Sequence, residues 1–173
     1  SFGHPITTLP PLAEAVSDFA SKGAEKLRRS GLQAGAAMVY VRTSPFRPGP
    51  KFYRTTVTQL QPPTADTSLI VNAALRGLKS IYAPGYQLAK AGVLLLDLAS
   101  STHEQLELLQ GLQPDKSSLM EAVDRINARY GRGSIHLAST GMPHHDDAGW
   151  RMKQEMRTPR CTTRFDEIPV LRA

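Results

Sequence analysis

The run LAKAGVLLLDL at residues 88–98 contains the longest apolar stretch of this 173-residue chain. A turn at Pro84 and Gly85 precedes it, and polar residues follow Leu98. A continuous apolar run of this length is typical of a strand at the centre of a sheet. Because a membrane-spanning helix needs roughly 20 apolar residues, we expect no membrane span and no membrane partner.

Two strand patterns lie upstream of this run. AAMVYVR at residues 36–42 is rich in β-branched and aromatic residues, and FYRTTVTQL at residues 52–60 alternates well enough to be its hairpin partner. The loop between them is long, basic and rich in Gly and Pro. These features predict a β-hairpin.

Two amphipathic helices are predicted, one before and one after the hairpin. Residues 12–27 place apolar side chains at spacings of three, four and seven, and Gly31 follows the basic end of this segment, where a helix would stop. The second helix is expected to end at about Tyr82, with Thr64 or Asp66 as its N-cap.

A strand at residues 2–7 would complete the order strand, helix, strand, strand, helix, strand. We therefore predict an α+β fold for residues 1–98, a split βαββαβ sandwich with a four-stranded sheet and two helices on one face. The other face of the sheet is then left to meet a partner.

The chain changes character after the apolar run. Residues 99–115 are polar and rich in turn formers, which indicates a linker, and residues 116–173 are expected to form a small, partly irregular C-terminal α/β tail. Within this tail we predict a helix at residues 117–130 and a short strand at residues 134–138.

Positive charge is concentrated in the first part of the chain. The 21 Lys and Arg exceed the 15 Asp and Glu by six, and residues 1–98 hold 11 basic and 5 acidic residues, which accounts for the whole excess. Hydroxyl and cationic side chains gather at one end of the hairpin, and this combination contacts phosphates without reading base sequence. The group comprises Arg42, Thr43, Ser44, Arg47, Lys51, Tyr53 and Arg54. The alternative is a solvated basic surface.

The residues required for phosphoryl transfer are missing. Neither clustered carboxylates for Mg²⁺ nor a glycine-rich phosphate loop with a lysine is present in the sequence, which predicts a non-catalytic chain. His144, His145, Asp146 and Asp147 have metal-ligand side chains, but adjacent side chains point apart, which favours a polar loop over a metal site.

Two further features bear on cellular location and origin. Cys161 is the single cysteine, so no internal disulfide forms, and this favours a reducing, cytoplasmic location. The chain does not begin with Met, which suggests a mature fragment or a piece of a longer protein.

The segment QLELL at residues 105–109 places three leucines in a hydrophilic linker. An exposed apolar segment of this kind docks in a groove on a partner. Packing of these leucines against their own domain is the alternative.

Four motifs together resemble the C-terminal part of the UmuC-type Y-family translesion DNA polymerases, catalytic subunits of DNA polymerase V. The motifs are SFGHPIT at 1–7, RTSPF at 42–46, ALRGLKSIYAPGYQLAKAGVLLLDL at 74–98 and TPRCTTRFDEIPVLRA at 158–173. The resemblance covers essentially the whole chain. Residues 1–98 resemble the little-finger domain of these polymerases, and residues 116–173 resemble their tail domain, with Cys161 and Phe165 where Tyr and Trp are expected.

The resemblance implies that the catalytic domains with their Mg²⁺ carboxylates lie upstream, and that this fragment needs no cofactor. It implies that the little finger grips the backbone of primer–template DNA through Ser1, Phe2, Gly3, His4, Arg42, Thr43, Ser44, Lys51, Arg54, Thr55 and Lys90. QLELL resembles the motif by which bacterial polymerases bind the β sliding clamp, through Gln105, Leu106, Leu108 and Leu109.

The expected partners are therefore DNA, the clamp, the UmuD′ dimer and the RecA filament. The expected role is DNA binding and partner recruitment within an error-prone, SOS-induced polymerase. The alternatives are a stand-alone protein-interaction module without a DNA role, and an enzyme that uses a metal site at residues 144–147.

Overall fold

The computed structural model describes residues 1–100, 116–141, 150–152, 158–160 and 162–168. The elements are α1 (Leu9–Arg29), β1 (Leu32–Thr43), β2 (Tyr53–Thr64), α2 (Thr67–Ile81), β3 (Leu88–Ser100), α3 (Ser117–Tyr130) and two short 3-10 helices, η1 (Ala138–Thr140) and η2 (Phe165–Glu167). The predicted α+β class and all three predicted helices are confirmed.

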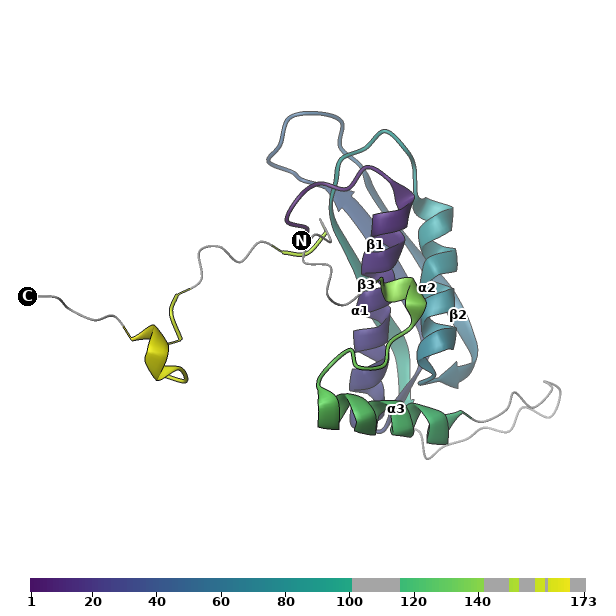
Figure 1. Cartoon of the computed structure of the whole chain (residues 1–173). Helices are drawn as coiled ribbons and strands as arrows, with labels where there is room; N and C mark the ends of the chain where they lie inside the picture. Colours follow the sequence, from purple (N-terminus) through teal and green to yellow (C-terminus); the bar gives the residue numbers. More distant parts are fainter. Residues whose placement is uncertain (101–115, 142–149, 153–157, 161, 169–173) are drawn as a thin grey trace, which may run out of the picture.

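The sheet has three strands in the order β2-β1-β3, and both pairs are antiparallel. The central strand is therefore β1, and the prediction that residues 88–98 lie at the centre is wrong. Small side chains make β1 suited to this place, because Ala34, Ala36 and Ala37 are fully buried. Helices α1 and α2 both cover the same face of the sheet (Figure 1).

The N-terminal segment does not form the predicted fourth strand. Its pairing with β3 is one isolated antiparallel bridge between Ile6 and Leu88, with one further bond from the Phe2 N–H to the Ala89 carbonyl. Two local features prevent a longer ladder. Pro5 has no N–H to donate, and the Gly3 N–H donates to the carbonyl of Arg151.

Strand β2 continues beyond the predicted end at Leu60 and passes through Pro62 and Pro63 to Thr64. Proline removes a backbone donor, which a strand tolerates when its outer side has no partner. Since β2 is an edge strand, its prolines fit this rule.

The core lies between the helices and the sheet. Leu12 and Val16 of α1 and Ile70 and Leu78 of α2 are fully buried. Of the two predicted caps for α2, Asp66 is the N-cap, and its carboxylate accepts the N–H groups of Ser68 and Leu69. At the end of α1, Gly31 adopts a φ of 64°, the left-handed conformation that stops the helix as predicted.

An ion pair holds α3 against the first 100 residues. The Arg28 guanidinium donates to both carboxylate oxygens of Asp124 at 2.7 and 2.8 Å, to the Ala65 carbonyl at 2.7 Å and to the Thr67 hydroxyl at 2.8 Å. Its side chain is only 12% exposed. A bidentate, largely desolvated pair of this kind is stronger than an exposed one.

A second contact comes from Trp150, which is 7% exposed and belongs to the hydrophobic core. Its ring meets Phe19 of α1 edge to face, with centroids 5.9 Å apart. Leu137, just before η1, also packs against this core. Residues of the predicted tail therefore complete the packing around α1.

The predicted strand at residues 134–138 is wrong. The side-chain amide of Asn127 donates to the Ile135 carbonyl and accepts the Ile135 N–H, both at 2.9 Å. Because the backbone of Ile135 is bonded to this side chain, it has no groups left for a sheet neighbour. Among the helices of the described residues, none combines the length and the apolar character needed to cross a membrane.

We expect Arg28→Ala to lower the free energy of unfolding by about 2 kcal/mol, since it leaves the Asp124 carboxylate without its partner. Urea unfolding of the full chain measures this. Arg29→Ala is the matched control, because the neighbouring Arg29 is 66% exposed and pairs with Glu25 on the same helix. That variant should cost less than about 0.5 kcal/mol, and equal losses for both variants would contradict the structural role of Arg28.

We expect Trp150→Ala to lower the free energy of unfolding by about 3 kcal/mol, because it leaves a cavity beside Phe19.

Truncation after Ser100 should also lower the midpoint of unfolding but keep one cooperative transition, since the sheet and both covering helices remain. Chemical denaturation followed by circular dichroism measures the stability of the truncated chain and of the Trp150→Ala variant. A truncated chain without a cooperative transition would argue against a domain that ends near residue 98.

Candidate nucleic-acid interface

The strand register brings cations onto the open face of the sheet. Arg42 is paired with Tyr53 of β2 on one side and with Lys90 of β3 on the other. Paired residues of neighbouring strands point to the same face, whereas successive residues alternate. Val39 and Val41 are buried under the helices, so Arg42 and its two partners lie on the opposite, open face.

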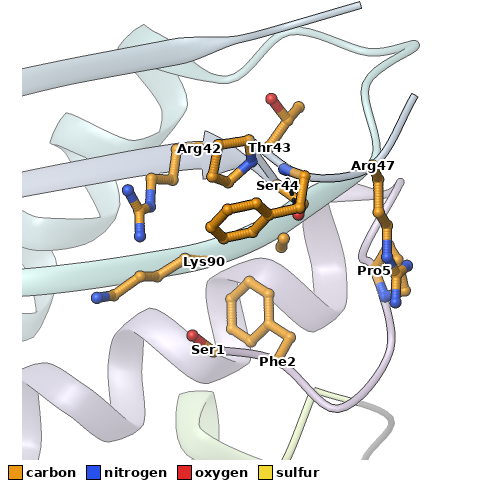
Figure 2. Close-up of a pocket in the computed structure, with 11 residues that line it drawn as sticks. Ser1, Phe2, Pro5, Arg42, Thr43, Ser44, Arg47 and Lys90 are labelled. Atoms are coloured by element: carbon orange, nitrogen blue, oxygen red, sulfur yellow. Dashed lines mark hydrogen bonds between the residues drawn. The ribbon is translucent and has the colours of Figure 1, made fainter. Parts of the chain in front are cut away.

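Three separate segments meet at one end of this sheet and enclose a hollow of about 250 Å³. They are the N-terminal segment, the loop after β1 and the start of β3. Figure 2 shows Arg42 and Lys90 extending in the same direction on one side of the hollow, with Arg47 on the opposite side and the ring of Phe2 between them. The lining residues are Ser1, Phe2, Pro5, Arg42, Thr43, Ser44, Pro45, Phe46, Arg47, Ala89 and Lys90.

The hollow carries a concentrated positive potential. Like charges directly opposite each other in a sheet are destabilising, yet Arg42 faces Lys90. Within the described residues neither side chain has an ion-pair partner, and no acidic residue lines the hollow. An anionic ligand would relieve this repulsion.

Lys51 organises the loop beside the hollow. Its ammonium group donates to the carbonyls of Ser44 and Pro45, each at 3.1 Å, and to that of Arg47. The Ser44 hydroxyl in turn accepts the N–H of Phe46 at 3.3 Å. An ammonium has three donors, and all three are engaged here, so Lys51 shapes the loop as well as adding charge.

Several residues predicted to bind DNA have their polar groups engaged within the protein or point away from the open face. Thr43 is largely buried, and its hydroxyl accepts the N–H of Phe52 at 3.0 Å. Arg54 is paired with Val41, so it points away from the open face, and its guanidinium lies 5.8 Å from the centre of the Phe52 ring. The Gly3 N–H is engaged by Arg151.

Thr55 and His4 complete the predicted set. Thr55 is paired with Tyr40, which puts it on the open face, and its hydroxyl donates to the Val39 carbonyl at 3.2 Å. His4 is exposed and does not line the hollow. The structure thus brings together Ser1, Phe2, Arg42, Thr43, Ser44 and Lys90 at the hollow and leaves Gly3, His4, Lys51, Arg54 and Thr55 out of its lining.

The predicted contacts omitted Phe46, whose side chain is 94% exposed at the hollow. The available signal was an aromatic residue inside a basic Gly/Pro loop. Pattern reasoning about cations and hydroxyls passes over such a residue.

Several predictions fall outside the described residues. They concern the clamp motif with Gln105, Leu106, Leu108 and Leu109, the cluster at residues 144–147, and Cys161. Phe165, the other departure in the tail, lies in η2 and is 82% exposed. Over the part of the chain that the structure describes, no three His, Cys, Asp or Glu side chains gather in a way that could hold a metal ion.

Comparison with known families identifies the chain. The profile of the impB/mucB/samB family C-terminal domain matches residues 1–108, and a domain of unknown function, DUF4113, matches residues 117–171. The chain therefore belongs to the impB/mucB/samB family, of which it represents the C-terminal region.

Individual relatives agree with this assignment. The chain is 36% identical to Protein UmuC of Salmonella typhimurium over 171 residues, and 37% identical to Protein SamB of the same organism over 173 residues. Protein MucB of Escherichia coli is 34% identical over 173 residues. These matches cover 97–98% of this chain and 40% of each relative. The resemblance to UmuC-type proteins is confirmed, and the chain spans about 40% of the length of these curated relatives.

Proposed function

We propose that this chain is the DNA-binding and partner-recruiting part of an error-prone, SOS-induced Y-family translesion DNA polymerase. In the whole protein, polymerase chemistry with Mg²⁺ would belong to other domains. The proposal rests on membership of the UmuC-type family together with one observation. Arg42 and Lys90 face each other beside a hollow to which the described part of the chain contributes no acidic residue.

The open face of the sheet would lie against the backbone of primer–template DNA. Arg42, Lys90 and Arg47 would contact phosphates, and the hydroxyl of Ser44 would add a hydrogen bond. Contacts of this type fix the position of a protein on DNA without selecting a base sequence. A polymerase that copies damaged templates needs such indifference to sequence.

The remaining parts of the proposal follow from the family. Residues 1–98 would act as the little finger, 99–115 as a linker that binds the sliding clamp through QLELL, and 116–173 as the tail domain. The UmuD′ dimer and the RecA filament are the proposed partners of the assembled polymerase, and the cytoplasm its location.

A stand-alone protein-interaction module is the competing function. Such a module would bind protein partners through the apolar segment at residues 105–109 and through the basic tail. The basic surface of residues 1–98 would then serve only solubility. The facing Arg42 and Lys90 favour the DNA function, because a surface that merely needs solubility gains nothing from two cations placed opposite each other.

We expect Arg42→Ala and Lys90→Ala each to weaken binding to primer–template DNA equally for all sequences. Each should also reduce the slope of log affinity against log salt concentration by about one, because each removes one phosphate contact. Fluorescence anisotropy at several salt concentrations measures both. Arg29→Ala removes the same charge from the helical layer and should leave the slope unchanged. A sequence-selective loss, or affinity indifferent to salt in the parent chain, would refute the proposed function.

We expect the double variant Leu106→Ala with Leu108→Ala to abolish binding to the sliding clamp, because it removes the apolar anchors of QLELL. Affinity for DNA should stay the same. Pull-down with purified clamp, and anisotropy with DNA, test the two statements separately. The double variant Leu119→Ala with Ile135→Ala is the control, since both side chains are exposed and belong to the tail. Clamp binding that survives in the QLELL variant would rule out this segment.

A further inference from the structure

We propose that the hollow binds one unpaired nucleobase of single-stranded DNA, held against Phe46 and Phe2, with Arg42, Arg47 and Lys90 on the flanking phosphates. This rests on the proposed function and goes beyond it. Backbone contacts need only cations and hydroxyls, whereas the hollow also presents two aromatic rings.

The aromatic character of the hollow is the first argument. A single exposed phenylalanine on a surface is common and needs no explanation. Here, however, the 94% exposed Phe46 lines the same hollow as the partly buried Phe2, and cations lie on both sides of Phe2 (Figure 2). Aromatic rings next to a basic track are the features by which proteins bind single strands.

The loop that carries Phe46 is held in place before any ligand arrives. The Lys51 ammonium donates hydrogen bonds to the carbonyls of Ser44, Pro45 and Arg47, residues that flank Phe46 on both sides. The Phe46 N–H is bonded to the Ser44 hydroxyl. These bonds hold the backbone around Phe46 in one conformation, while the ring stays exposed. Stacking of a base on the ring therefore costs little conformational entropy of the loop.

The size of the hollow fits a ligand of this kind. Its volume of about 250 Å³ lies just below the range of pockets that take whole small molecules, which suits one planar heterocycle and not a base pair. In a duplex the faces of the bases are already stacked, so only an unpaired base offers a face to these rings.

A tryptophan at position 46 reports directly on stacking. The chain contains one tryptophan, the buried Trp150, so Phe46→Trp adds an exposed fluorophore over a constant background. We expect thymidine oligonucleotides to quench it, and expect little quenching by an abasic oligonucleotide with the same number of phosphates or by a duplex. Equal quenching by the abasic strand would overturn the proposal.

Affinity provides the second readout on the full chain. Phe46→Ala should weaken binding to single-stranded DNA about tenfold and leave duplex binding and the melting temperature unchanged. Phe165→Ala, which removes another exposed phenylalanine, should change neither affinity. If Phe46→Ala binds single strands as tightly as the parent, or loses duplex binding equally, the base site is refuted. If the parent chain binds no DNA at low salt, the proposed function itself fails.

Discussion

The register of β1 between its two neighbours is the constraint on which both faces of the molecule depend. Val39 and Val41 point into the core, and Tyr40 and Arg42 point to the open face. A shift by one residue would exchange these sets, burying a guanidinium and exposing valine. Because β1 is hydrogen-bonded along both edges, a slip would break two ladders at once. The ladder that buries the core therefore also fixes Arg42 beside Lys90.

The open face also contains a close approach that only glycine permits. The ring of Tyr40 lies across Gly92, so that a Cβ added there would be 2.6 Å from the ring carbon Cζ and 2.7 Å from the hydroxyl oxygen. The tyrosine can lie flat because its cross-strand partner has no side chain. The middle of this face is thus low and largely apolar, and the cations stand at its end.

Local periodicity was sufficient to predict most of the fold. Spacings of three and four located the helices, and alternation located the hairpin, because burial of one face leaves this trace in the sequence. The predicted fourth strand does not form, because Pro5 has no N–H and the Gly3 N–H is bonded to the carbonyl of Arg151. The pair of Arg28 with Asp124 joins residues 96 apart in the chain, and nothing in the local pattern distinguishes Arg28 from the exposed Arg29.

The candidate site also combines features that the sequence predicted with features that only the structure shows. Arg42 was predicted from the cluster of cations and hydroxyls at the hairpin end, and Lys90 from the family resemblance. The register places the two together. The engagement of Lys51 by three carbonyls and the projection of Phe46 depend on the conformation of one irregular loop. No periodic pattern encodes such a loop, so its residues are predicted as charges and aromatics, and their separate tasks emerge only from the structure.

The N-terminal segment is hydrogen-bonded to residue 151, far along the chain. The Gly3 N–H donates to the carbonyl of Arg151, next to the buried Trp150, while Phe2 lines the basic hollow. Two neighbouring residues of the N-terminal segment therefore serve both ends of this connection. Gly3 holds the segment that places Trp150 on α1, and Phe2 forms a wall of the hollow. The first family match ends at residue 108 and the second begins at residue 117, but contacts cross that division at Arg28 and at Gly3. If Trp150 were displaced from the core, the neighbouring Arg151 carbonyl would no longer accept the Gly3 N–H. The position of Phe2, one residue away at the wall of the hollow, would then change.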